Sequence, residues 1–370
     1  MKTSLLHESA LDCSFDNIAT ISEQSTKTQE CKTKAIYNKS RPHKVVYFDN
    51  PIYVAGRMSI VGKKEGEGPL GKYFDKVESD GKCGQKNFEL AEIRFLQDSI
   101  WGAVKKSNLT INDIDLMLSG DLLNQLTTSN FVARNLGLPF LGLYSACSSM
   151  TQALLLGSVM IDAKHANNVV CGVSSHFASA ERQFRTPLEY GGQKPPYSQW
   201  TVTGAGSTVL SSKGEGIKIT KAIIGTVIDM GTRDMANMGA AMAPALMHTL
   251  VAFLKETGTT MDDYDLVVSG DLGKLGADIV RNLALEQGIV LGKKYIDCGA
   301  IIYSHMQTAY QGGSGCACSA TVVNSFVMSK MLDGTYHKVL YLATGALMSP
   351  QSTYQGETIP CISHGVLLEI

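Results

Sequence analysis

Two small-residue turns that contain cysteine are the parts of this sequence best suited to chemistry. The first is Ser145-Ala146-Cys147-Ser148-Ser149, and the second is Cys316-Ala317-Cys318-Ser319-Ala320. An apolar helix is expected after each turn, so Cys147 would lie at a helix N-terminus, where unpaired backbone N–H groups favour a thiolate and can hold an oxyanion. This pattern predicts a nucleophile or a pocket residue. The simpler alternative is a buried structural thiol, because cysteine is among the residues most often buried.

A catalytic thiolate also needs a base beside it. Three histidines are candidates: His176 follows a predicted strand, His305 lies in a polar loop, and His364 adjoins the last predicted strand. A single histidine near a strand end is more often a hydrogen-bonding structural residue than a base. Spacing alone selects none of the three, so catalytic roles for Cys147, His176 and His364 are conditional on the protein being an enzyme.

The two turns belong to a duplicated unit. The segment Ile114 to Leu122 returns almost unchanged as Tyr264 to Leu272, at a constant offset (265 − 115 = 150). Each copy is expected to run strand, helix, strand, cysteine turn, helix, strand. A long unit present twice indicates two halves packed about a pseudo-twofold axis, because solenoid repeats are much shorter. Asp121 and Asp271 occupy equivalent positions, which favours a shared structural role such as capping the following helix.

The apolar pattern predicts the elements that position these residues. Ile93, Leu96, Ile100 and Val104 recur at steps of three and four, as on one face of a helix. We expect helices at 89–106, 122–136, 150–162, 244–256 and 274–287, and strands at 45–48, 116–119, 139–144, 169–174, 207–211, 217–228, 266–269, 339–343 and 361–368. Residues 62–71 and 176–204 are expected to be loops, the second long enough to be functional. Alternating apolar strands and helices, together with the pseudo-symmetry, predict a five-layer α-β-α-β-α fold.

Bulk composition narrows the possible classes of protein. Of 370 residues, 44% are hydrophobic and 18% are charged, with a net charge of −1, so we expect no nucleic-acid partner. The polar residues 1–44 are expected to form a disordered tail, 45–230 the N-terminal half and 231–370 the C-terminal half. No apolar run reaches the roughly 18–20 residues of a membrane span. Nine cysteines without a disulfide spacing suggest reduced thiols and no zinc site.

The repeated strand, cysteine turn and helix resemble the thiolase-like superfamily of thiolases and ketoacyl synthases. Longer strings resemble, more narrowly, the stage V sporulation protein AD family of spore-forming bacteria. These strings are Phe48-Asp49-Asn50-Pro51, Gly312-Gly313-Ser314-Gly315-Cys316 and residues 64–71, 119–125, 139–144, 189–196 and 200–206. The similarity extends from about residue 45 to the C-terminus.

The resemblance implies a thiolase-like fold that binds dipicolinic acid (pyridine-2,6-dicarboxylate) for its uptake into the developing spore. It implies no cofactor, except that calcium is expected to accompany the ligand. Its implied partners are small integral membrane proteins of the same sporulation operon, and the superfamily habit suggests a homodimer. The implied location is the cytoplasm or the periphery of the forespore inner membrane, without a transmembrane segment.

Departures from the enzymes imply a non-catalytic relative. Where thiolases carry Gly-His-Pro with an essential histidine, this chain has Ser314, so the base is missing. The alternative is an acyltransferase of the thiolase or ketoacyl-synthase type that uses Cys147 as its nucleophile. For ligand binding we expect cations at Arg185 and Lys194 and a calcium ligand at Asp297. The expected ligand-binding set is Cys147, Ser148, His176, Arg185, Lys194, Asp297, Ser314, Cys318 and His364.

Overall fold

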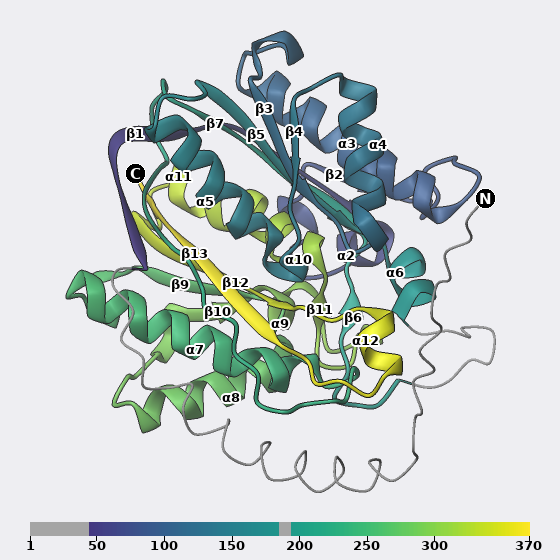
Figure 1. Ribbon diagram of the computed structural model, residues 1–370, viewed down its shortest axis with the longest axis vertical. Helices are drawn as coiled ribbons and strands as arrows, with labels where there is room; N and C mark the ends of the chain where they lie inside the picture. Colours follow the sequence, from purple (N-terminus) through teal and green to yellow (C-terminus); the bar gives the residue numbers. More distant parts are fainter. Residues whose placement is uncertain (1–43, 185–193) are drawn as a thin grey trace, which may run out of the picture. The chain divides into compact units, whose positions relative to one another are not determined.

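A computed structural model describes residues 44–184 and 194–370 of the chain. Residues 44–370 cluster into one compact unit (Figure 1). The expected disordered tail and the expected role of Arg185 fall on residues outside the described part.

One long sheet runs through this unit and consists of two similar halves. Its path is β4 (Phe140–Gly142), β3 (Leu116–Gly120), β5 (Asn168–Ser175), β7 (Gly204–Ser211), β1 (Val45–Gly62), β8 (Lys218–Ile223), β13 (Cys361–Glu369), β12 (Lys338–Ala346), β9 (Leu266–Gly270) and β10 (Tyr295–Asp297). The first five strands form one half and the last five form the other. Strand β1 joins them, because it pairs with β8 through its first residues and with β7 through its later ones. A short β2 (Lys76–Glu78) also pairs with β1.

Strand register confirms the duplication. In the first half β3 runs parallel to β4 and β5, and in the second β9 runs parallel to β10 and β12. Asp115 accepts hydrogen bonds from the amides of Asn167 and Asn168, at the start of β5. Asp265 accepts them from the amides of His337 and Lys338, at the start of β12. The sheet order places β8 in the second half. The expected division of the chain at residue 230 stays a prediction.

Helices form three layers around the sheet. Helices α3 (Phe88–Lys106) and α4 (Thr127–Leu136) cover one outer face, and α7 (Met238–Thr257) and α8 (Gly273–Glu286) cover the other. Between the two halves lie α5 (Ser149–Asp162), α10 (Cys316–Val322), a π-helical turn (Val323–Val327) and α11 (Met328–Leu332). Both α5 and α10 contact strands of the sheet halves on either side, which confirms the five-layer α-β-α-β-α fold (Figure 1).

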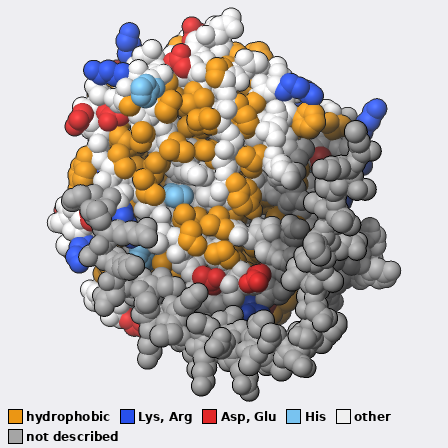
Figure 2. Space-filling view, in the orientation of Figure 1, with side chains coloured by type: hydrophobic (Ala, Val, Ile, Leu, Met, Phe, Trp, Pro, Cys, Tyr) orange, Lys and Arg blue, Asp and Glu red, His pale blue; other side chains and the backbone are white. Residues whose placement is uncertain are grey.

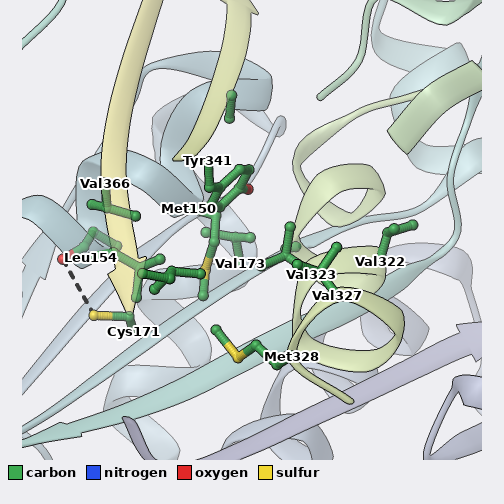
Figure 3. Close-up of a cluster of buried hydrophobic side chains, with 14 of the residues drawn as sticks. Met150, Leu154, Cys171, Val173, Val322, Val323, Val327, Met328, Tyr341 and Val366 are labelled. Carbon is green, nitrogen blue, oxygen red and sulfur yellow. Dashed lines mark hydrogen bonds between the residues drawn. The ribbon is translucent and has the colours of Figure 1, made fainter. Parts of the chain in front are cut away.

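The central core contains side chains from both halves of the duplication. Figure 3 shows Met150 and Leu154 of α5 near Tyr341 of β12 and Val366 of β13, all buried. The Cys171 thiol donates to a carbonyl oxygen of α5 at 3.3 Å. Figure 2 shows that hydrophobic side chains also reach the surface over the middle of the face seen in Figure 1, with charged side chains toward its margin.

Several expected elements differ from the observed ones. Helix α4 begins only at Thr127, because Gln125 and Leu126 have the left-handed φ values 53° and 56°. Strand β4 lies at the edge of the sheet and is not buried, with Leu141 51% exposed. Strand β1 continues past Phe48, because a register shift absorbs residues 49–51. The segment after residue 176, expected to be a loop, begins with helix α6 (Phe177–Phe184).

Helix α7 also begins earlier than expected, at Met238. Its small residues let it approach α8 closely, since a Cβ on Gly239 would lie 2.5 Å from the Leu272 carbonyl oxygen. By length and composition α7 is apolar enough to cross a membrane, contrary to the expectation that no apolar run is long enough. Its most apolar window is 56% buried inside the protein, and its side chains fill the core between α8 and the sheet. We therefore describe α7 as a core helix.

Candidate functional site

The two cysteine turns contact each other where the halves of the protein meet. Cys147 lies in a 3₁₀ turn (Ala146–Ser148) directly before α5, as the small-residue cysteine turn predicts. Its sulfur accepts a hydrogen bond from the Gly315 amide at 3.2 Å, and the Cys316 thiol donates to the Ala146 carbonyl oxygen at 3.0 Å. Ala146 and Gly315 both have positive φ, 49° and 102°. The chain is thus tightly bent on both sides of the Cys147 sulfur.

A cavity of about 390 Å³ opens beside Cys147. Its deep end contains Cys147, Ser314 and Gln199, all at most 5% exposed, and its rim contains the exposed Arg233 and Asp234. Most of the remaining lining is apolar: Leu122, Tyr144, Ala146, Ala180, Phe184, Met235, Met238, Ala346 and Met348. Predominantly apolar walls with a few polar groups are typical of a small-molecule site.

An ion pair forms part of the cavity wall. The Lys194 ammonium contacts the Glu181 carboxylate of α6 and donates to the Gln199 carbonyl oxygen at 3.1 Å. Beside it, Phe177 and Trp200 stack with their ring centroids 3.8 Å apart, and the ammonium lies 5.1 and 5.4 Å from these rings. The formal charges of the described cavity residues therefore cancel: Lys194 and Arg233 against Glu181 and Asp234.

The electrostatic setting of Cys147 opposes a thiolate. Burial raises the pKa of the Cys147 thiol, and the Asp271 carboxyl raises it further, whereas the Gly315 amide lowers it. Since the two raising influences outweigh the hydrogen bond, the sulfur is a neutral thiol at ordinary pH.

Neither of the two conditional bases lies beside this thiol. His176 is 3% exposed, with Nε2 2.7 Å from the Gly81 carbonyl oxygen and Nδ1 accepting from the Ala178 amide. Burial lowers its pKa. In His364, Nδ1 accepts from the Gly225 amide, and burial lowers the pKa to about 4. Among the described residues that line the cavity there is no histidine.

The carboxylate of Asp297, the expected calcium ligand, has a structural role in this fold. It accepts hydrogen bonds from the Ser269 hydroxyl and from the amides of Leu272, Gly273 and Ala300, at 2.7 to 3.2 Å. It thereby caps the short helix α9 (Cys298–Ile302). Calcium takes about six to eight oxygen ligands, and the described part of the chain has no cluster of three acidic, histidine or cysteine side chains placed for a metal.

Only some of the predicted ligand-binding residues line the cavity. The structure brings Cys147, Ser314 and Lys194 together around the cavity. It places Ser148 and Cys318 behind the lining, both fully buried, and Ser148 donates to the Ala343 carbonyl oxygen at 3.1 Å. His176, Asp297 and His364 also lie outside the lining.

Sequence reasoning missed seven polar lining residues. These are Glu181, Ser198, Gln199, Thr201, Arg233, Asp234 and Thr353. A signal existed for Gln199, which stands beside Trp200 in the long polar segment. It links the segments around the cavity, because its amide donates to the carbonyl oxygens of Asp271 and Gly313 at 2.5 and 3.1 Å. Arg233 lies in a segment without any motif.

Comparisons with known proteins agree with this architecture. Among solved structures, 3-oxoacyl-[acyl-carrier-protein] synthase III from Aquifex aeolicus VF5 superposes with a TM-score of 0.54 at 14% identity, covering 87% of this chain and 100% of that one. Cerulenin-bound OleA from Xanthomonas campestris gives 0.56 at 12% identity, covering 88% and 98%. At such low identity these likenesses show only that the fold is thiolase-like.

Sequence comparison gives a closer relationship. The family described as Stage V sporulation protein AD (SpoVAD) matches residues 42–369. Stage V sporulation protein AD from Bacillus subtilis (strain 168) is 46% identical over 322 residues, which cover 87% of this chain and 95% of that protein. The chain therefore belongs to the stage V sporulation protein AD family, a sporulation family with a thiolase-like fold.

Proposed function

We propose that this protein binds dipicolinic acid in the cavity beside Cys147 and serves its uptake into the developing spore. The observation that carries this proposal is a cavity that contains the Cys147 thiol but has no histidine in its described lining. Such a site can hold a small molecule, whereas acyl transfer requires a base for the thiol. Membership of a sporulation family supplies the biological setting.

The chemistry of the cavity suits a flat aromatic dicarboxylate. The apolar wall, with Tyr144 and several methionines, offers contact for the pyridine ring. Lys194 and Arg233 supply cations for carboxylate oxygens, and the Ser314 hydroxyl can donate a hydrogen bond at the deep end.

Charge balance favours the calcium complex over the free dianion. The four charged side chains described around the cavity sum to zero, so a ligand with two negative charges enters without net attraction. Calcium dipicolinate in a 1:1 ratio is neutral and avoids this penalty. Because no metal cluster is present among the described residues, calcium would arrive as part of the cargo.

The expected partners follow from the same proposal. A protein that delivers dipicolinate to a spore works beside membrane proteins of the same operon, at the periphery of the forespore inner membrane. A homodimer is the proposed assembly state. Size-exclusion chromatography with light scattering tests it: a monomer mass at micromolar concentration would remove the dimer and leave ligand binding untouched.

Calorimetry tests the ligand. We expect saturable binding of dipicolinate, tighter when calcium is present in equal amount, and weaker binding of pyridine-2-carboxylate, which lacks one carboxylate. Cys147→Ala should weaken binding, whereas Cys83→Ala, which removes a thiol outside the cavity, should not. Absence of saturable binding with and without calcium would reject the proposal.

Acyl transfer by Cys147 is the competing function. It predicts a covalent adduct, visible as an added acyl mass on the Cys147 peptide after incubation with acyl-coenzyme A thioesters. We expect no adduct, since neither His176 nor His364 lines the cavity. An adduct that disappears in Cys147→Ala would establish the enzyme instead.

A further inference from the structure

A two-stranded parallel sheet contributes to the wall of the cavity beside Cys147. Its strands are β6 (Trp200–Thr201) and β11 (Gly313–Ser314), which lie side by side in Figure 1. In the register of this sheet Thr201 is the partner of Ser314. Paired residues of neighbouring strands lie about 4.8 Å apart and point to the same face. Thr201 and Ser314 are thus neighbours on one face, and both line the cavity.

The other face of this small sheet is used for packing. The Trp200 ring stacks on Phe177 with the ring centroids 3.8 Å apart, and the Val202 side chain is fully buried. Neither Trp200 nor Val202 lines the cavity. Because side chains alternate along a strand, this packing leaves Thr201 on the cavity side.

Backbone hydrogen bonds hold the two strands in place. The Trp200 amide donates to the Gly312 carbonyl oxygen at 2.8 Å. The Val202 amide donates to the Ser314 carbonyl oxygen, also at 2.8 Å. Side chains on regular strands are placed more precisely than side chains on loops, so the two hydroxyls have a fixed spacing.

The hydroxyls of Thr201 and Ser314 have no hydrogen bond to another group in the part of the chain that the structure describes. Both lie close to the Cys147 thiol. A Cβ on Gly315, the residue after Ser314, would be 3.2 Å from the Thr201 methyl carbon, and the Gly315 amide donates to the Cys147 sulfur at 3.2 Å. Two hydroxyls and a neutral thiol therefore lie together at the deep end of the cavity.

This pair of hydroxyls suits a carboxylate. Each hydroxyl can donate one hydrogen bond, and each oxygen of a carboxylate can accept at least one. Hydrogen bonds to an ionised acceptor are roughly twice as strong as those between neutral groups. A carboxylate held here would also leave Lys194 and Arg233, elsewhere in the lining, for a second carboxylate of the same ligand.

We propose that Thr201 and Ser314 form a carboxylate-binding subsite, in which each hydroxyl donates to one oxygen of the same carboxylate of a small aromatic acid. Thr201 is then a specificity-determining residue of the cavity, supplied by the first half of the chain, and Ser314 is its counterpart from the second half. The identification of the acid as dipicolinate rests on the proposed function.

Calorimetry with dipicolinate and with pyridine-2-carboxylate, on the full-length protein, tests the subsite. Thr201→Val replaces the hydroxyl by a methyl group of similar size and should weaken the binding of both acids about tenfold. Thr201→Ser keeps the hydroxyl and should bind both acids as the parent does. Ser314→Ala should reproduce the loss from the paired strand. Thr335→Val, the same change at an exposed threonine outside the lining, should have no effect.

Thermal unfolding separates ligand binding from a structural role. Because the Thr201 hydroxyl has no partner in the described part of the protein, its removal should leave the melting temperature of Thr201→Val unchanged. If Thr201→Val does not fold, Ser314→Ala provides the same comparison. Unchanged affinity in the folded variant overturns the subsite, and so does a loss of affinity that Thr201→Ser shares.

The two acids separate the subsite from the proposed function. If pyridine-2-carboxylate binds in a manner that depends on Thr201 while dipicolinate does not bind, only the proposed function is rejected. If dipicolinate binds the parent and Thr201→Val equally well, only the subsite is rejected. Failure of both acids to bind the parent rejects both.

Discussion

The Gly315 amide donates a hydrogen bond to the Cys147 sulfur at 3.2 Å, and this contact joins the cysteine turn of one half to that of the other. Neither half contains the site alone, because Cys147 comes from the first half and Ser314 and Gly315 from the second. The left-handed φ of 102° at Gly315 aims its amide at the sulfur. A Cβ there would lie 2.8 Å from the Ser175 hydroxyl oxygen.

Gly315→Ala should therefore damage both stability and binding. Strain at the positive φ and the contact with Ser175 should lower the free energy of unfolding by on the order of 1–3 kcal/mol. Displacement of the amide should also weaken dipicolinate binding. Gly334→Ala is the matched control, since Gly334 has φ +80° but open space around its Cβ position. Urea unfolding and calorimetry check both variants; equal losses in the two would show that only backbone strain matters at Gly315.

Glu181→Gln should change which form of the ligand is preferred. Removal of this charge leaves the described cavity lining with a net charge of +1, so free dipicolinate should bind about tenfold tighter, or about 1.4 kcal/mol. The advantage of the calcium complex should shrink accordingly. Asp333→Asn makes the same change in net charge at the surface, beside Lys330 and away from the cavity, and should have no effect. Calorimetric titration of both variants with dipicolinate, with and without calcium, measures these affinities. If Glu181→Gln prefers the calcium complex as strongly as the parent protein does, charge balance is not the cause of that preference.

Most of the fold could be predicted, because the sequence patterns of its strands and helices are local and occur in both halves of the chain. Each strand between Leu116 and Gly120 or between Leu266 and Gly270 is a short apolar run, and each cysteine turn precedes an apolar helix. The errors arose where tertiary contacts override local preference. Strand β1 continues through Asn50 because Asp162 binds its amide, and Asn50 in turn donates to the Asp162 backbone.

The site was less predictable, because identical strings have different environments. Ser-Gly-Asp-Leu occurs in both halves, but Asp121 is a cap and Asp271 is not. The difference originates in Asp297, which is distant in sequence and adjacent in the sheet. Similarly, the cationic residue Arg233 reaches the cavity only through the path of the chain between β8 and α7, which no periodicity reveals.

His364 should make stability depend on pH. Burial lowers its pKa to about 4 in the folded state, against about 6.5 in the unfolded chain. The neutral form is the one that folds, so stability is complete above pH 6.5 and falls as the pH drops toward 4, by up to about 3 kcal/mol. In His364→Gln this part of the loss should vanish. Urea unfolding at about pH 7 and about pH 4.5 measures this loss of stability. His305→Gln, at an exposed histidine, is the control. Equal losses in the His364 variant and the parent would show that His364 is not the cause.

Asp297→Asn separates a structural carboxylate from a calcium ligand. In the parent protein each carboxylate oxygen accepts two hydrogen bonds, and the amide of asparagine would turn a donor toward two of these donors. Since each unsatisfied buried donor is unfavourable by about 1–3 kcal/mol, the melting temperature should fall clearly. Calcium alone should not raise the melting temperature of the parent, because both oxygens are already occupied. Thermal unfolding of parent and variant with and without calcium gives the answer. A calcium-dependent stabilisation of the parent that the variant lacks, with no dipicolinate present, would restore Asp297 as a metal ligand.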